Sequence, residues 1–155
     1  MTLCEARNPF GASWGADDTI VFGQGREGIL RVSSAGGTPE VLVAMSAEES
    51  YAHGPQVLPD GKSLLFTLGD GTNWDDAQIV VQSLTTGERR VLIEGGTDTR
   101  YVSTGHLVYA LRGTLMALPF DAARLEVTGG PVSLVEGIAT AAGAASFSIW
   151  LSAGV

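Results

Sequence analysis

Three stretches of the chain repeat one pattern, and this repeat limits the possible fold more than any other feature of the sequence. Each stretch is a short β-type run, a polar turn and a second β-type run ending in an aromatic residue: residues 13–22, 57–66 and 101–109. The closing aromatics are Phe22, Phe66 and Tyr109, which stand 44 and 43 residues apart. A period of about 40–45 residues built from short strands indicates a repeat architecture in which each unit is one small sheet.

The remainder of each unit supplies two further predicted strands. The third strands are predicted at residues 29–32, 79–82 and 115–118, and the fourth at residues 41–43, 90–93 and 132–135. Turn residues separate these runs, and no window longer than a turn or two has apolar residues at helical spacing. The sequence therefore predicts an all-β chain, a β-propeller fragment of about three four-stranded antiparallel blades at residues 11–45, 53–95 and 99–138.

Both ends of the chain extend the pattern. Residues 1–10 are predicted to hold the outer strand of a preceding blade, at Thr2–Ala6, and residues 144–155 the start of an incomplete blade, at Ala145–Ile149. Because propellers use typically four to eight blades, three blades form an open arc that exposes apolar blade faces. We therefore expect the arc to be completed, either by another copy, as in a homodimer that closes the propeller, or by further residues of a longer chain.

The charge of the chain narrows the choice of partners. Nine Lys and Arg against 17 Asp and Glu give a net charge of −8. Nucleic acid and anionic membrane surfaces bind cationic patches, so we expect neither as a partner. No apolar run approaches the roughly 20 residues that span a bilayer, no signal peptide is visible, and the single cysteine, Cys4, excludes an internal disulfide. The sequence leaves the compartment unknown.

Several motifs of the repeat resemble a known family. The segments Leu58-Pro59-Asp60-Gly61-Lys62, Gly36-Gly37-Thr38-Pro39, Gly87-Glu88-Arg89-Arg90 and Gly105-His106-Leu107-Val108-Tyr109 are similar to TolB-type, WD-like propeller repeats, and the likeness runs from Gly11 to Gly137. It is especially close to the propeller regions of some bacterial serine/threonine kinases. The resemblance implies a sensing or protein-interaction propeller of extracytoplasmic origin, and it brings no catalytic residues.

Blade geometry predicts a candidate binding rim. The loop between strands two and three of a blade lies on the same side as the crossings between blades, which groups the loop at 69–76 with the crossings at 45–55 and 95–100. Exposed aromatics beside polar side chains are typical of recognition surfaces. The rim candidates are Tyr51, His53, Asp70, Trp74, Asp75, Asp76, Asp98 and Arg100, with Glu48 and Glu49 beside them.

Two readings of the loop at 69–76 remain open from the sequence. Its carboxylates and amide could surround Ca²⁺, or they could be the ordinary residues of a solvated hairpin loop. The two histidines, His53 and His106, occupy different parts of the repeat, so no metal site and no cofactor are predicted. Trp14, Phe22, Phe66 and Tyr109 are expected to pack between blades, and Asp60 to cap its own turn.

The leading functional hypothesis is a non-enzymatic propeller module that binds a protein or peptide. The segment Gly23–Gly28 has the letters of a dinucleotide fingerprint but lies between two predicted strands, and no other catalytic or phosphate-binding motif occurs. One alternative is a propeller-type hydrolase or lyase that uses rim carboxylates. Another is a truncated, mobile fragment with no evolved partner beyond self-association.

Overall fold

Short strands account for most of the regular structure in the part of the chain that the computed structural model describes, which is residues 2–47, 49, 51–141 and 144–145. The first sheet consists of β1 (Ala12–Trp14), β2 (Thr19–Gly23), β3 (Ile29–Ser33) and β4 (Glu40–Val43). The second consists of β5 (Tyr51–Val57), β6 (Ser63–Gly69), β7 (Gln78–Ser83) and β8 (Arg89–Glu94). Both sheets are antiparallel with sequential strand order, and we call them blade one and blade two.

Blade three contains one more strand than the repeat predicts. It comprises β9 (Thr97–Val102), β10 (His106–Leu111), β11 (Thr114–Asp121), β12 (Glu126–Val127) and β13 (Val132–Glu136). The long strand β11 pairs with β13 along its first half and with β12 at its end. The sequence predicted no strand between the third and fourth strands of this unit, at residues 115–118 and 132–135, because a two-residue strand gives no periodic signal.

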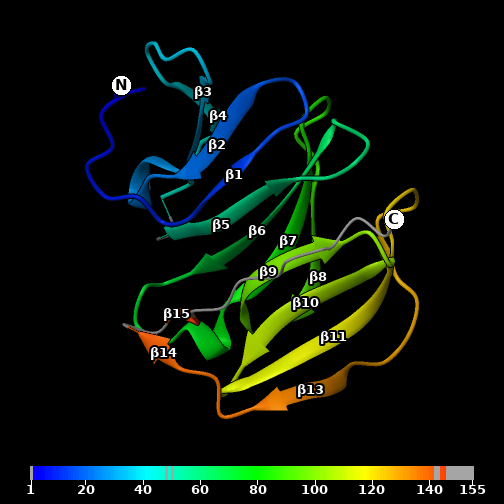
Figure 1. Ribbon diagram of the computed structural model, residues 1–155. Coiled ribbons are helices and arrows are strands. Elements are labelled where there is room, and N and C mark those ends of the chain that lie inside the picture. Colours follow the sequence, from blue (N-terminus) through cyan, green and yellow to red (C-terminus); the bar gives the residue numbers. More distant parts are fainter. Residues whose placement is uncertain (1, 48, 50, 142–143, 146–155) are drawn as a thin grey trace, which may run out of the picture.

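The three blades stand side by side as an arc, with blade two in the middle (Figure 1). The first strands of the blades lie next to one another. The Gln56 side chain joins β5 to β9 in the way a backbone pair would. Its Oε1 accepts from the Tyr101 N–H at 2.8 Å, and its Nε2 donates to the Tyr101 carbonyl at 3.2 Å. Gly11 lies so near β5 that a Cβ there would stand 2.9 Å from the Gly54 Cα.

The core consists of two inter-blade clusters, which follow from the two-residue period of the strands. Leu64, Phe66 and Val80 of blade two point toward blade one and pack with Val21 and Ile29. The alternate residues of blade two point the opposite way and pack with blade three, in a cluster that contains Leu65, Ile79, Val81, Leu107, Tyr109, Leu118 and Phe120. The predicted packing of Phe66 and Tyr109 between blades is confirmed.

Two other aromatics lie elsewhere than predicted. Phe22 is buried, but on the face of blade one that points away from blade two, where it packs with Leu30, Val32 and Cys4. Trp14 is 65% exposed, so it is not an inter-blade core residue. Both belong to the end blade of the arc, whose far face no further blade covers within the described residues, and the repeat alone did not reveal this.

The predicted end segments also differ from expectation. Thr2–Ala6 is not a strand in the structure; the Leu3 carbonyl accepts one hydrogen bond, from the Gly37 N–H, and Cys4 packs on blade one. A single bond of this kind does not make a strand ladder. At the other end, β14 (Thr140–Ala141) pairs with β15 (Ala144–Ala145), and the predicted strand at Ala145–Ile149 lies almost wholly outside the described residues.

Candidate functional site

The structure places the predicted rim loop beside the crossing between blades two and three. The loop after β6 carries the short 3-10 helix η2 (Trp74–Asp76), and a second one, η1 (Gly25–Glu27), occupies the same position in blade one. The Asp75 carbonyl accepts from the Gly96 N–H, and the Asp75 Oδ1 accepts from the Arg112 N–H at 2.8 Å. These bonds join the blade-two loop to the crossing and to the equivalent loop of blade three.

Three of the eight rim candidates are buried and do not form an exposed surface. Trp74 is only 4% exposed, His53 8% and Asp98 7%. The Trp74 ring lies 5.2 Å from the His53 ring and 6.3 Å from the Phe10 ring, and Phe10 also contacts Tyr51. The expectation that Trp74 is an exposed recognition aromatic was therefore wrong. The N-terminal segment brings Phe10 over this ring cluster, and no feature of the local sequence around Trp74 could have shown that.

His53 and Asp98 form a buried polar pair inside this cluster. The His53 Nδ1 lies 3.1 Å from the Asp98 Oδ1. Burial lowers the pKa of His53 below its ordinary value; the nearby Asp98 carboxylate opposes this shift, and the Arg100 guanidinium adds to it. Arg100 is itself held by the Gly54 and Thr99 carbonyls, to which its Nη1 donates at 3.0 and 2.9 Å. His53, Asp98 and Arg100 therefore join β5 to β9, the first strands of blades two and three.

The acidic loop is organised by its own turn. The Asp70 Oδ1 accepts from the Thr72 N–H and hydroxyl, both at 2.7 Å, and these bonds lower the pKa of Asp70. The Asn73 amide oxygen accepts from the Asp75 N–H, and its Nδ2 donates to Asp76. Among the described residues no group of three or more His, Cys, Asp or Glu is arranged to hold a metal ion.

Asp70, Asp76 and Glu49 border an open, polar hollow of about 370 Å³ on the rim face. Glu49 is already paired with Arg89, which also donates to Gln82. Of the remaining candidates, Tyr51 is partly buried beneath Arg26, and Asp75 is tied to blade three. Glu48 lies outside the described residues. The rim is therefore a set of internally paired side chains around a shallow polar hollow.

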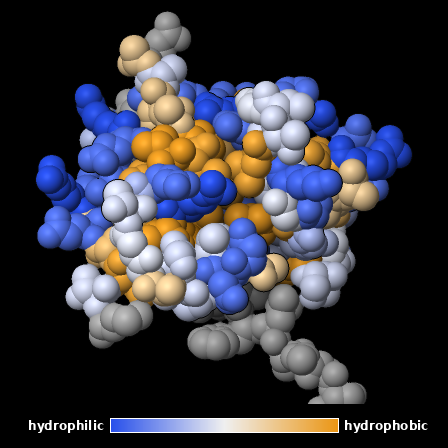
Figure 2. Space-filling view, turned by 90° about the horizontal axis from the view of Figure 1, so that it is seen from above, coloured by the Kyte–Doolittle hydropathy of each residue, from blue (hydrophilic) through white to orange (hydrophobic). Residues whose placement is uncertain are grey.

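A second hollow, of about 320 Å³, lies on the opposite face, where blades one and two diverge. Its wall continues the inter-blade core, since Leu42, Val57 and Leu84 line it and also pack on the buried cluster. Tyr101 and Pro59 complete the apolar lining, and Trp14 stands at the edge. Seen from this side, apolar residues gather at the centre within a hydrophilic border (Figure 2).

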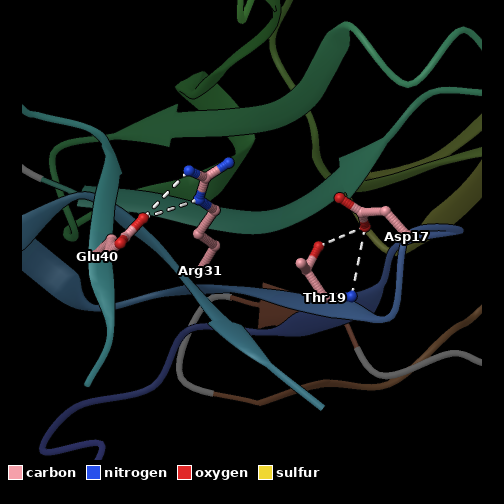
Figure 3. Close-up of polar contacts among 4 residues, drawn as sticks. All are labelled: Asp17, Thr19, Arg31 and Glu40. Atoms are coloured by element: carbon pink, nitrogen blue, oxygen red, sulfur yellow. Dashed lines mark hydrogen bonds and ion pairs between the residues drawn. The ribbon is translucent and has the colours of Figure 1, made fainter. Parts of the chain in front are cut away.

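Charged side chains stand at the mouth of this hollow and are held by neighbours (Figure 3). The Arg31 guanidinium donates to one oxygen of Glu40 through Nε at 3.3 Å and Nη2 at 3.1 Å. The Asp17 Oδ1 accepts from the Thr19 hydroxyl at 2.6 Å, and this bond lowers the pKa of Asp17. Across the mouth, Asp60 accepts from Lys62 and Ser63, so its predicted role as the cap of its own turn is confirmed.

Sequence reasoning missed this hollow for a physical reason. Leu42, Val57 and Leu84 fit the alternating pattern of core residues, and the pattern does not show where two blades separate. The one available signal was the exposed end of the first repeat, where Trp14 directly precedes the turn at residues 15–18.

Comparison with known structures defines the class of the fold. The chain is similar to regucalcin, a calcium-binding protein from Agrobacterium tumefaciens, with 13% identity, a TM-score of 0.58, and coverage of 81% of this chain and 44% of that one. It is also similar to a chain of a nidogen/laminin complex, with 17% identity, a TM-score of 0.59, and coverage of 82% and 48%. The β-propeller domain of the Trilobed protease from Pyrococcus furiosus gives 13% identity, a TM-score of 0.51, and coverage of 84% and 45%.

These neighbours and the three sheets show that the chain is a β-propeller fragment, as the repeat predicted. The chain spans less than half the length of each of these three solved structures. No protein-family model matches the chain, and no curated protein matches it. Within the described residues, no helix is long and apolar enough to cross a membrane.

Proposed function

We propose that the chain is a non-enzymatic module that binds a segment of another protein in the apolar hollow between blades one and two. The observation that carries this proposal is that the inter-blade core opens there to solvent, with Leu42, Val57, Leu84 and Tyr101 in its wall. Binding sites in proteins are concave, mostly apolar and bordered by a few polar groups, and they begin at about 300 Å³. This hollow has that size and character, whereas the rim hollow is polar.

The expected partner is an extended peptide with one large apolar side chain flanked by Lys or Arg. One such side chain is an appropriate occupant for the apolar part of a hollow of about 320 Å³. The cationic flanks follow from charge complementarity, because the chain carries a net charge of −8 and Asp17, Asp18 and Asp60 stand exposed at the turns around the mouth. Complementary charge speeds encounter and selects among partners.

The family resemblance belongs to this proposal. A TolB-type or WD-like repeat, of the kind that follows the membrane span in bacterial kinases, would place the module outside the cytoplasm, where a sensing propeller meets its partners.

Fluorescence polarisation with two labelled probe peptides tests the proposal. Both have a Leu-Trp centre, flanked in one by lysines and in the other by glutamates. We expect the lysine peptide to bind more tightly than the glutamate peptide. Leu84→Arg, which fills the hollow and adds a positive charge, should weaken its binding at least about tenfold, since burial of one apolar side chain contributes about 1.5–3 kcal/mol.

Val91→Arg is the matched control, because Val91 is an exposed residue on the outer strand of blade two and does not line the hollow. It should bind the lysine peptide like the unchanged chain. If neither peptide binds, or if Leu84→Arg binds as well as Val91→Arg, the proposed function is wrong.

A further inference from the structure

The outer strand of every blade contains a bulge at the same position. The three bulges can therefore be compared, to see what the equivalent face of each blade contacts. The register of β4 on β3 shifts so that Leu42 is the extra residue, because Ile29 pairs with Val43 and Leu30 with Val41. The corresponding shifts leave Leu92 extra on β8 and Leu134 extra on β13. A leucine therefore occupies the bulge in all three blades.

In blades one and two, this leucine faces the following blade. Leu42 packs on the cluster between blades one and two, next to the buried Val43. Leu92 and Ile93 pack on the cluster between blades two and three. By the same register, Leu134 and Val135 lie on the face of blade three that points away from blade two, over Val108 and Ala117. Yet Leu134 and Val135 are each 51% exposed, and Val132, on the same face, is 56% exposed.

The opposite end of the arc also carries exposed apolar side chains. The far face of blade one is covered at its middle, where Cys4 packs on Phe22 and Leu30. Trp14 and Val41 flank this covered part; each pairs across the sheet with a residue of that cluster, and they are 65% and 60% exposed. Five of the six large apolar side chains that are exposed in the described residues thus lie on the two end faces of the arc, and the sixth is Val91.

We propose that these two end faces are the two halves of an interface between copies of this chain. Two copies around a twofold axis place blade three of each against blade one of the other, so that Leu134 and Val135 cover Trp14 and Val41. The partner surface is a blade because the equivalent leucines, Leu42 and Leu92, contact blades within the chain. The resulting ring has about six blades, within the usual range, and the chain itself covers 44–48% of the propellers it resembles.

The N-terminal segment has a place in this ring. It lies on the far face of blade one, held by the hydrogen bond from the Gly37 N–H to the Leu3 carbonyl. That position is next to the outer strand of whatever blade docks there, and the outer edge of β13 has no pairing strand in the described residues. Thr2–Ala6 of one copy would then pair with β13 of the other, which is the outer-strand role that the sequence predicted for it.

The negative charge of each copy opposes association, so the proposed dimer should depend on salt in a characteristic direction. Two chains of net charge −8 repel each other, and salt screens this repulsion. The contact itself is apolar, so dimerisation should strengthen, and not weaken, as the salt concentration rises. An interface made of ion pairs would respond in the opposite direction.

Sedimentation velocity and light scattering at micromolar concentration test the proposal. We expect a mass of about twice the 16.1 kDa of one chain. Val135→Asp and Val41→Asp, one on each end face, should each give monomers with an unchanged β-sheet circular dichroism spectrum. Val91→Asp is the matched control, an exposed valine away from both faces, and should remain dimeric.

Mixing the two monomeric variants distinguishes this arrangement from others. A ring of one Val135→Asp copy and one Val41→Asp copy contains one contact with both substitutions and one with neither, so the mixture should regain dimers. A monomeric unchanged chain, a dimeric Val41→Asp variant or a mixture that stays monomeric would each overturn the proposal. Trp14 borders both the end face and the hollow, but none of the three substituted valines lines the hollow, so these variants test the interface without changing the peptide site.

Discussion

At the scale of single residues, the most unusual feature is a histidine kept away from water at the centre of a sheet arc. His53 lies between Asp98, Arg100 and the rings of Trp74 and Phe10. Burial favours its neutral form and lowers its pKa, against the opposing influence of Asp98. The residue therefore acts as a packing residue near neutral pH and as an unfavourable buried charge in acid.

This environment predicts an acid-sensitive fold. Unfolded chains take up a proton at His53 near its ordinary pKa of 6.5, whereas the folded chain resists protonation to lower pH. The stability that neutral His53 contributes is therefore complete above about pH 6.5 and is lost as the pH falls below it toward the folded-state pKa. Urea denaturation should show a lower midpoint at pH 5.5 than at pH 7.5.

Two histidine variants test whether His53 causes the loss of stability in acid. His53→Gln should reduce the difference between the two midpoints, because it removes the titrating group. His106→Gln, which changes the half-buried histidine of β10, should leave the difference as in the unchanged chain. An equal pH response in the unchanged chain and in His53→Gln would show that His53 does not cause it.

At the scale of elements, the sequence predicted what depends on local periodicity and missed what depends on neighbours. The second run of each repeat was predicted to be a strand that contains Phe22, Phe66 or Tyr109, and β2, β6 and β10 contain these residues, because alternation and turn residues are local signals. The bulges at Leu42, Leu92 and Leu134 leave no separate mark in the alternating pattern. The burial of Trp74 depends on Phe10, which is 64 residues away in the chain, and the apolar hollow depends on how two blades diverge.

The candidate site shows the same division. The grouping of the loop at 69–76 with the crossing at 95–100 followed from blade geometry, and hydrogen bonds from Gly96 and Arg112 to Asp75 occur there. Blade geometry did not show which of these side chains face water. The residue types of Trp74 and Asp98 are equally compatible with a surface and with a buried cluster. The second reading of the acidic loop, a hairpin loop with internal turn bonds, describes Asp70 and Asn73 as the structure has them.

Asp75 gives the element-scale prediction. Its side chain accepts from the Arg112 N–H in the turn between β10 and β11, so it holds two blades together through their loops. Asp75→Ala should lower the free energy of unfolding by about 0.5–1.5 kcal/mol, the usual contribution of one such bond, and speed amide exchange at Arg112. Asp76→Ala is the control, because in the described part of the chain the exposed Asp76 accepts from Asn73, a residue of its own loop. Equal exchange at Arg112 in both variants would contradict the assignment.

At the scale of the whole molecule, the main contacts between the described blades join each blade to its neighbours. Blade two contributes one set of residues to the cluster with blade one and the alternate set to the cluster with blade three. Stability in such an array is approximately a sum of unit and nearest-neighbour terms. Damage to one cluster should therefore loosen one end of the arc and leave the other end attached to blade two.

Two matched core truncations test this division. Phe66→Ala removes a fully buried ring from the cluster between blades one and two, and Leu107→Ala removes a fully buried side chain from the cluster between blades two and three. The free energy of unfolding should fall by about 3–5 kcal/mol for the ring and by about 2–5 kcal/mol for the leucine.

Hydrogen exchange should then show early loss of protection in β2 and β3 for Phe66→Ala, and in β10 and β11 for Leu107→Ala. The β6–β7 pair stays protected longest in both, because it retains one intact neighbour in each variant. Uniform loss of protection in all three blades would mean that the arc unfolds as one cooperative unit and that the two clusters are not separable.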